Sequence, residues 1–81
     1  MQQIDKNIIT PEQCRAARGL LNWSQEYLAK KVRVGKTAIG DFERGKTKPY
    51  RKTLEDIKFS FEAGGVRFID NEAEFGAVVL K

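Results

Sequence analysis

The fold of this chain is decided by residues 24–45, SQEYLAKKVRVGKTAIGDFERG. The hydroxyl of Ser24 can accept from the free N–H groups of a first helical turn. Trp23 before it and Leu28 after it have the spacing of a hydrophobic staple. A helix is therefore predicted to begin at Gln25.

A second helix is predicted from Lys36. Gly35 before it is an acceptable but weaker N-cap, and Val34 with Ile39 repeats the staple spacing. Gly45 suits the left-handed conformation in which helices often end. We expect this helix to end there, after about nine residues.

Three residues, 33–35, separate the two helices. A link this short predicts a bent pair of helices at a large angle. Apolar residues at helical spacing form the predicted inner face: Leu28, Ala29, Val32, Val34, Ile39 and Phe42. The polar positions that remain form the predicted exposed face: Gln25, Lys36, Thr37, Gly40, Asp41 and Arg44.

Two further helices are expected around this pair. Residues 10–13, TPEQ, form a capping box with proline at the first helical position, which predicts a helix from Pro11 to about Leu21 that carries Arg15 and Arg18 outward. A later helix is predicted over 51–63. We expect Phe59 and Phe61 in it to serve packing.

The C-terminal segment predicts two short strands, at 66–70 and 77–80, because both are rich in β-branched or aromatic residues. An isolated two-stranded ribbon is marginal in water, so this one must pack on the helices or pair with a second copy. We expect a dimer contact that includes Val66, Phe68, Val78 and Leu80. The predicted organisation is an arm at 1–9, a helix-turn-helix domain at 10–64 and a ribbon tail at 65–81.

Positive charge is concentrated on one part of the sequence. Residues 30–52 hold nine basic and two acidic side chains, whereas the remainder holds six basic and nine acidic ones. A solvated charged face is the ordinary explanation of such a run. Here it coincides with the predicted helix pair, which favours an electrostatic footprint for double-stranded DNA.

Composition argues against several other classes. The chain has one cysteine and no histidine, which leaves no internal disulfide and few metal-ligand or nucleophile sets, so we expect no enzyme and no cofactor. Cys14 lies at an apolar helical position, which favours packing over redox sensing. Because no apolar run approaches ~20 residues, we expect no membrane role, and the single cysteine favours a reducing cytoplasm.

Residues 10–62 resemble the Cro and phage-repressor class of helix-turn-helix proteins. The resemblance rests on Arg15, Arg18, Leu20, residues 23–25, Leu28, Ala29, Val34, Ile39, residues 42–45 and Pro49. It implies a mainly α fold, a lambda-repressor-like bundle of about four helices, here followed by the short β-ribbon. It also implies sequence-specific binding to double-stranded DNA by a nucleoid-associated protein of bacterial or phage origin.

The resemblance implies roles for individual residues. The DNA bases would be contacted by Gln25, Lys36, Thr37, Ala38, Gly40 and Asp41. The phosphates would be contacted by Ser24, Arg44, Lys46 and Lys48.

The chain departs from this class at three positions. Arg33 stands where the turn usually has glycine, so either a positive φ is strained by ~1 kcal/mol or a different turn is used. Gly35 replaces the usual Ser or Thr cap. Gly40 stands where a long polar side chain is common, so either the backbone approaches DNA there or the position contacts nothing.

Three functions are compatible with these features. The first is a transcriptional regulator, a repressor that binds an inverted-repeat operator as a homodimer. The second is the antitoxin of a toxin–antitoxin pair, which a neighbouring toxin gene would indicate. The third is a protein-interaction module such as an anti-activator, which would lack salt-dependent DNA binding; a toxin or an antirepressor is thus a possible protein partner.

Overall fold

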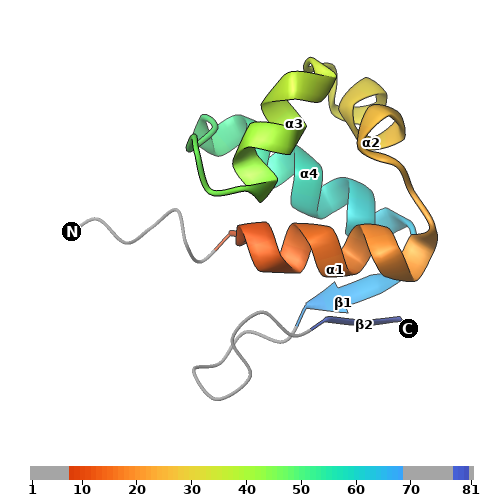
Figure 1. Ribbon diagram of the computed structural model, residues 1–81. Helices are drawn as coiled ribbons and strands as arrows, with labels where there is room; N and C mark the ends of the chain where they lie inside the picture. The colour runs from red at the N-terminus through yellow and green to blue at the C-terminus, as the bar shows by residue number, and fades with distance from the viewer. Residues whose placement is uncertain (1–7, 69–77, 81) are drawn as a thin grey trace.

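The computed structural model describes residues 8–68 and 78–80. This part of the chain contains four helices and a two-stranded ribbon, as expected for a mainly α helix-turn-helix bundle (Figure 1). In chain order the elements are α1 (Pro11–Leu21), α2 (Gln25–Val32), α3 (Lys36–Glu43), α4 (Arg51–Ala63), β1 (Val66–Phe68) and β2 (Val78–Leu80). No helix of this part is long and apolar enough to cross a membrane.

Side-chain caps start the first two helices where the sequence predicts them. The Thr10 hydroxyl accepts from the Gln13 N–H at 3.1 Å, and the Gln13 side chain accepts from the Thr10 N–H at 3.0 Å. The Ser24 hydroxyl accepts from the Tyr27 N–H at 2.9 Å. Gly35 precedes α3 in an extended conformation, and α3 ends at Glu43, close to the predicted end.

The turn between α2 and α3 uses the left-handed conformation at Arg33, which has φ 62° and ψ 45°. The turn therefore keeps its usual geometry although Arg33 replaces the usual glycine. The arginine adopts a left-handed backbone conformation that is unfavourable for a residue with a Cβ. Asn22 adopts nearly the same conformation after α1. Gly45 after α3 has φ 77°, as its predicted role at the helix end requires.

The hydrophobic core lies between the four helices and β1. All the apolar residues predicted for the inner face belong to it, with Val34 partly buried at its edge. The Trp23 ring stacks on Phe61 of α4, with centroids 5.4 Å apart. The buried apolar residues are Ile9, Cys14, Ala17, Leu28, Ala29, Val32, Ile39, Phe42, Leu54, Ile57, Phe61 and Val66.

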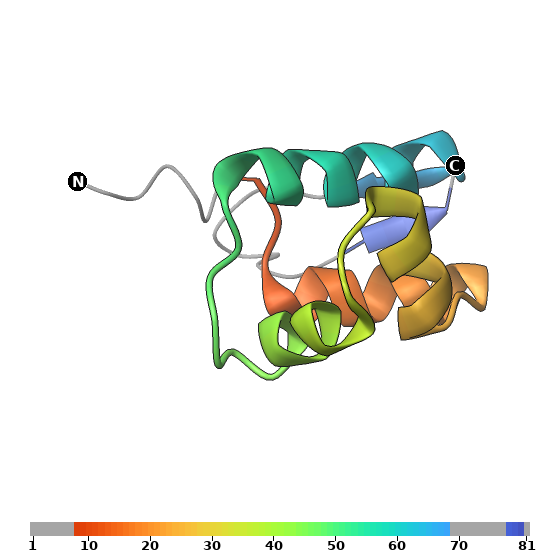
Figure 2. The ribbon, with the colours of Figure 1, turned by 90° about the horizontal axis from the view of Figure 1, so that it is seen from above.

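The ribbon pairs within the chain and packs against its own helices. β1 and β2 are antiparallel, with Val66 opposite Leu80 and Phe68 opposite Val78. β2 contacts α1 and β1 contacts α4. In Figure 1 the ribbon lies beneath α1, on the side away from α2 and α3, and Figure 2 gives the view from above.

This packing corrects the proposed role of Val66. Its side chain is fully buried in the core of its own chain, so it is not available to a second copy. Phe68 is half-buried, with its ring 6.3 Å from that of Phe61. The side chains of Val78 and Leu80 lie outside the described part of the chain. Ile9 and Val66 both belong to the core, which therefore extends beyond residues 10–64.

Candidate nucleic-acid interface

The outward face of α3 is formed by the first residues of the helix. Lys36, Thr37 and Ala38 are all exposed, as predicted for residues that contact DNA bases. Ile39 and Phe42 hold the opposite face of α3 in the core. Since α2 and α3 are joined by a tight turn, α3 has a fixed orientation relative to α2 (Figure 1).

A buried carboxylate, Glu43, joins α3 to α1 and α2. The Glu43 side chain accepts from Arg18 Nε at 2.7 Å and Arg18 Nη2 at 2.8 Å, in a two-point ion pair. It also accepts from Gln25 Nε2 at 3.0 Å and from Cys14 Sγ at 3.1 Å. Arg15 completes the arrangement by donating to the Glu43 carbonyl. Glu43 therefore fixes where α3 sits against both neighbouring helices.

The expected outward orientation of Arg18 is wrong. Arg18 is half-buried, because its guanidinium turns toward Glu43 and also donates to the Trp23 carbonyl at 3.0 Å. Glu43 itself is only 2% exposed. A signal for this pair exists in the sequence, since Glu43 follows Ile39 by four residues and so falls on the apolar stripe of its helix.

The electrostatics of this cluster keep Glu43 ionised. Burial acts to raise the pKa of the Glu43 carboxyl, but hydrogen bonds from Arg18, Gln25 and Cys14, together with the Arg18 charge, lower it below its usual value. Burial and the bond to Glu43 raise the pKa of the Cys14 thiol. A buried thiol held protonated is a poor nucleophile, which agrees with a packing role for Cys14.

Gln25 and Ser24 lie at the beginning of α2. Gln25 is half-buried and bonded to Glu43, whereas Ser24 is exposed and caps the helix. Both are predicted to contact DNA, and since the Ser24 hydroxyl accepts in the cap, its O–H can still donate to a phosphate oxygen.

Gly40 does not lie on the exposed face, contrary to the expectation. It is buried because two side chains cover it. A Cβ at this position would lie 3.3 Å from Arg44 Nη1 and 3.5 Å from Gln25 Oε1. The space left by the missing side chain is therefore filled by the ends of Arg44 and Gln25.

Arg44 and Asp41 form an ion pair along the surface of α3. Arg44 Nη2 donates to Asp41 Oδ1, three residues earlier in the chain. Asp41 is half-buried and Arg44 is exposed. Asp41, which is predicted to contact bases, thus lies beside Arg44, which is predicted to contact phosphates.

The remaining predicted phosphate contacts belong to the segment between α3 and α4. Lys46 and Lys48 are both exposed in this segment. Figure 2 shows it leaving the end of α3 before the chain enters α4. Their charges therefore lie close to the C-terminal end of α3.

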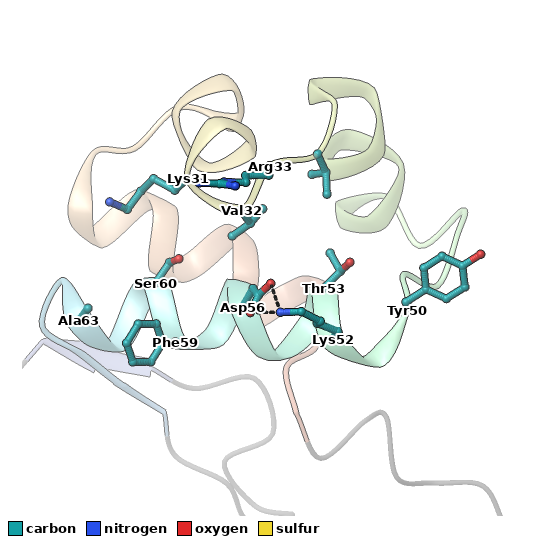
Figure 3. A pocket seen from close by; sticks show the side chains of 11 residues that line it. Lys31, Val32, Arg33, Tyr50, Lys52, Thr53, Asp56, Phe59, Ser60 and Ala63 are labelled. Carbon is teal, nitrogen blue, oxygen red and sulfur yellow. Dashed lines mark hydrogen bonds and ion pairs between the residues drawn. The ribbon is translucent and has the colours of Figure 1, made fainter.

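An open groove of about 910 Å³ lies between α2 and α4 (Figure 3). Tyr50 and Phe59 line it, at 86% and 70% exposure, so the expectation that Phe59 serves packing is wrong. Lys52 and Asp56 form an ion pair in the groove at 3.2 Å. Because the residues of this groove come from α2, the turn and α4, it is separate from the exposed face of α3.

Comparison with known proteins agrees with the geometry. A search of the curated proteins found no match. A family model described as helix-turn-helix matches residues 15–57, a range that includes all of α2 and α3 and most of α1 and α4. The chain thus belongs to the helix-turn-helix family of the Cro and phage-repressor type, and it is a DNA-binding regulator.

Proposed function

We propose that this protein represses transcription by occupying an inverted-repeat operator as a homodimer. The observation that carries the proposal is the contrast between the two faces of α3. Lys36, Thr37 and Ala38 are exposed, whereas Glu43 binds the helix to α1 and α2. A rigid helix with a polar outward face is what insertion into the major groove requires.

The distribution of charge supports the same orientation. Lys46 and Lys48 follow α3 directly and are exposed. Cations beside a helix in the major groove contact the flanking phosphates, which position the protein on the duplex. Base contacts from Lys36 and Thr37 would then supply the sequence preference.

Geometry favours a dimer. One helix-turn-helix covers only a few base pairs, whereas two copies related by a two-fold axis read half-sites ~34 Å apart and combine their affinities. Val66 is buried in its own chain, so its side chain cannot supply the contact. Tyr50 and Phe59 are the two most exposed large hydrophobic side chains in the described residues, and we place the dimer contact on α4 around them.

The experiment is selection of bound duplexes from a random DNA pool by the full chain, followed by analytical ultracentrifugation with and without the selected DNA. We expect an inverted repeat with half-site centres about one helical turn apart and a protein dimer. Phe59→Ser should shift the chain toward monomer and weaken operator binding without unfolding it. Leu20→Ser on α1 is the matched control, because Leu20 is an exposed large hydrophobic residue outside this groove.

Each other outcome contradicts a definite part of the proposal. A single half-site bound by a monomer contradicts the dimer but not DNA recognition. Failure to enrich any sequence contradicts the regulator itself and favours a protein-interaction module. Dimers that persist in Phe59→Ser place the contact away from Phe59.

A protein partner is a second candidate for the groove between α2 and α4. The exposed Phe59 and Tyr50 would suit a toxin as well as a second copy of this chain. Co-expression with the product of a neighbouring gene, followed by size-exclusion chromatography of wild type and Phe59→Ser, separates the two. A complex that the variant loses favours the antitoxin function.

A further inference from the structure

We propose that Arg44 reads a guanine in the major groove, and that Gly40 and Asp41 hold its guanidinium in the position this requires. The inference rests on the proposed operator binding and adds a specificity-determining residue to it. It also changes the role expected for Arg44, from a phosphate contact to a base contact.

The Arg44 side chain runs back along α3 toward the start of the helix. Long side chains on a helix point back toward its N-terminus, over the residues three and four positions earlier. Arg44 follows Gly40 by four residues and Asp41 by three, and its guanidinium reaches both. It therefore lies along α3, between Gln25 and Asp41, and not out toward Lys46.

Gly40 makes this position available. Arg44 Nη1 lies 3.3 Å from the place where a Cβ of residue 40 would be. A longer side chain at this position would occupy the same space and displace the guanidinium. A glycine inside a helix costs about 1 kcal/mol relative to alanine. Here the missing side chain leaves room for the Arg44 guanidinium.

Asp41 orients the guanidinium. It accepts from Arg44 Nη2, which uses one of the five guanidinium N–H donors. The donors left over can bind O6 and N7 of guanine in the bidentate geometry that arginine makes with this base. Because the Arg44 side chain is 59% exposed, it has access to a ligand above α3.

The surrounding residues agree with a base contact. Thr37 lies one turn before Asp41 on the same exposed face, so Arg44 continues the surface that the predicted base contacts begin. Gln25 Oε1 lies beside the Arg44 guanidinium, because it is 3.5 Å from the position that a Cβ of residue 40 would take. These side chains form one polar surface at the centre of the candidate interface.

The test compares the duplexes selected from a random pool by wild type and by Arg44→Lys. The variant keeps the charge and loses the planar fork, so we expect preference for guanine at one position of each half-site to fall roughly 5- to 150-fold, with unchanged affinity for unrelated duplex DNA. Arg51→Lys is the matched control, because Arg51 is 57% exposed and ion-paired with Glu55 at 3.1 Å on α4. It should keep the wild-type preference.

Gly40→Leu tests the positioning independently. Leucine fills the space over residue 40, so the same guanine position should lose preference while the positions contacted by Lys36 and Thr37 keep theirs. The melting temperature of each variant, measured alongside, shows whether the fold is kept, because leucine is the better helix former but must also move the ends of Arg44 and Gln25.

The contrary results are distinct. If Arg44→Ala weakens all duplexes equally, keeps the selected sequence and lowers the salt slope by about one, Arg44 contacts a phosphate and the inference is wrong. If Gly40→Leu keeps the guanine preference that Arg44→Lys loses, Gly40 has no positioning role. If the wild-type chain selects no sequence at all, the proposed function fails, and this inference fails with it.

Discussion

The guanidinium of Arg18 on α1 binds the carboxylate of Glu43 on α3 through two hydrogen bonds, of 2.7 and 2.8 Å. Glu43 is 2% exposed, so the carboxylate of this ion pair is shielded from water. The same carboxylate accepts from Gln25 at the start of α2. One side chain therefore links the helix that is proposed to enter DNA with the two helices that support it.

Removing the charge of Glu43 should destabilise the fold. Glu43→Gln leaves the Arg18 charge half-buried without its partner, and breaking a buried ion pair in this way costs about 3 to 5 kcal/mol. Urea unfolding followed by circular dichroism measures the loss. Glu55→Gln is the matched control, since Glu55 pairs with Arg51 on the surface, where a pair contributes at most about 1 kcal/mol. Equal losses in the two variants would contradict the role of Glu43.

The same ion pair predicts a dependence of stability on pH. The folded-state pKa of Glu43 lies below its usual value, so its contribution is fully present above the unfolded-state pKa of about 4.3 and is lost as the pH falls through the folded-state pKa. The difference in unfolding free energy between wild type and Glu43→Gln should be constant near neutral pH and should shrink below about pH 4. Urea titrations at a series of pH values test this, and a difference that does not change with pH argues against an ionised Glu43.

The left-handed turn residue offers a stabilising substitution. Arg33 has φ 62°, a conformation that costs a residue with a Cβ about 1 kcal/mol, so Arg33→Gly should stabilise the fold by up to that amount. For a domain of this size this would raise the melting temperature by about 4 to 8 °C. Asn22→Gly is the control, because Asn22 has φ 61° and asparagine tolerates this region. A melting temperature lowered by Arg33→Gly would show that the arginine side chain stabilises the turn.

The exposed residues at the start of α3 should determine sequence preference. Lys36→Ala and Thr37→Ala each remove one proposed base contact, and such a loss costs about 1 to 3 kcal/mol at particular base pairs. Non-specific binding should change little. Selection from a random pool measures the preference, with Lys58→Ala on α4, outside the groove and away from α3, as the control. If both variants select the wild-type sequence, α3 does not lie in the major groove as proposed.

The lysines after α3 should contribute to affinity for any sequence. If Lys46 and Lys48 each neutralise one phosphate, either alanine variant should lower the slope of log K against log salt by about 0.9 and weaken all duplexes alike. Fluorescence anisotropy at several salt concentrations measures both quantities. Lys58→Ala is the control, because Lys58 lies on α4 with its Nζ 5.8 Å from the Phe68 ring. A slope that stays at the wild-type value removes the lysine concerned from the phosphate contacts.

Sequence alone predicts the helices well because their signals are local. The Thr10 box, the Ser24 cap and Gly45 mark helix ends through the chemistry of one turn, and the observed ends agree closely. The family and its link to DNA follow from the same stretch, since the spacing of 24–45 is itself a local pattern. The exposed positions Lys36 and Thr37 follow from helical periodicity, whereas Ala38 is indicated only by the resemblance.

Only the tertiary structure decided what each ambiguous side chain contacts. Helical spacing places Arg18 at the surface, but a carboxylate distant in sequence turns it inward. Helical spacing also places Gly40 on the exposed face, but Arg44 and Gln25 cover it, because an absent side chain leaves room that neighbouring side chains fill. The strands of the ribbon were equally compatible with an intermolecular pair, and the burial of Val66 among the helices places them in one chain. Local patterns specify helices because their hydrogen bonds span four residues, whereas ion pairs and strand partners depend on contacts that only the folded chain brings together.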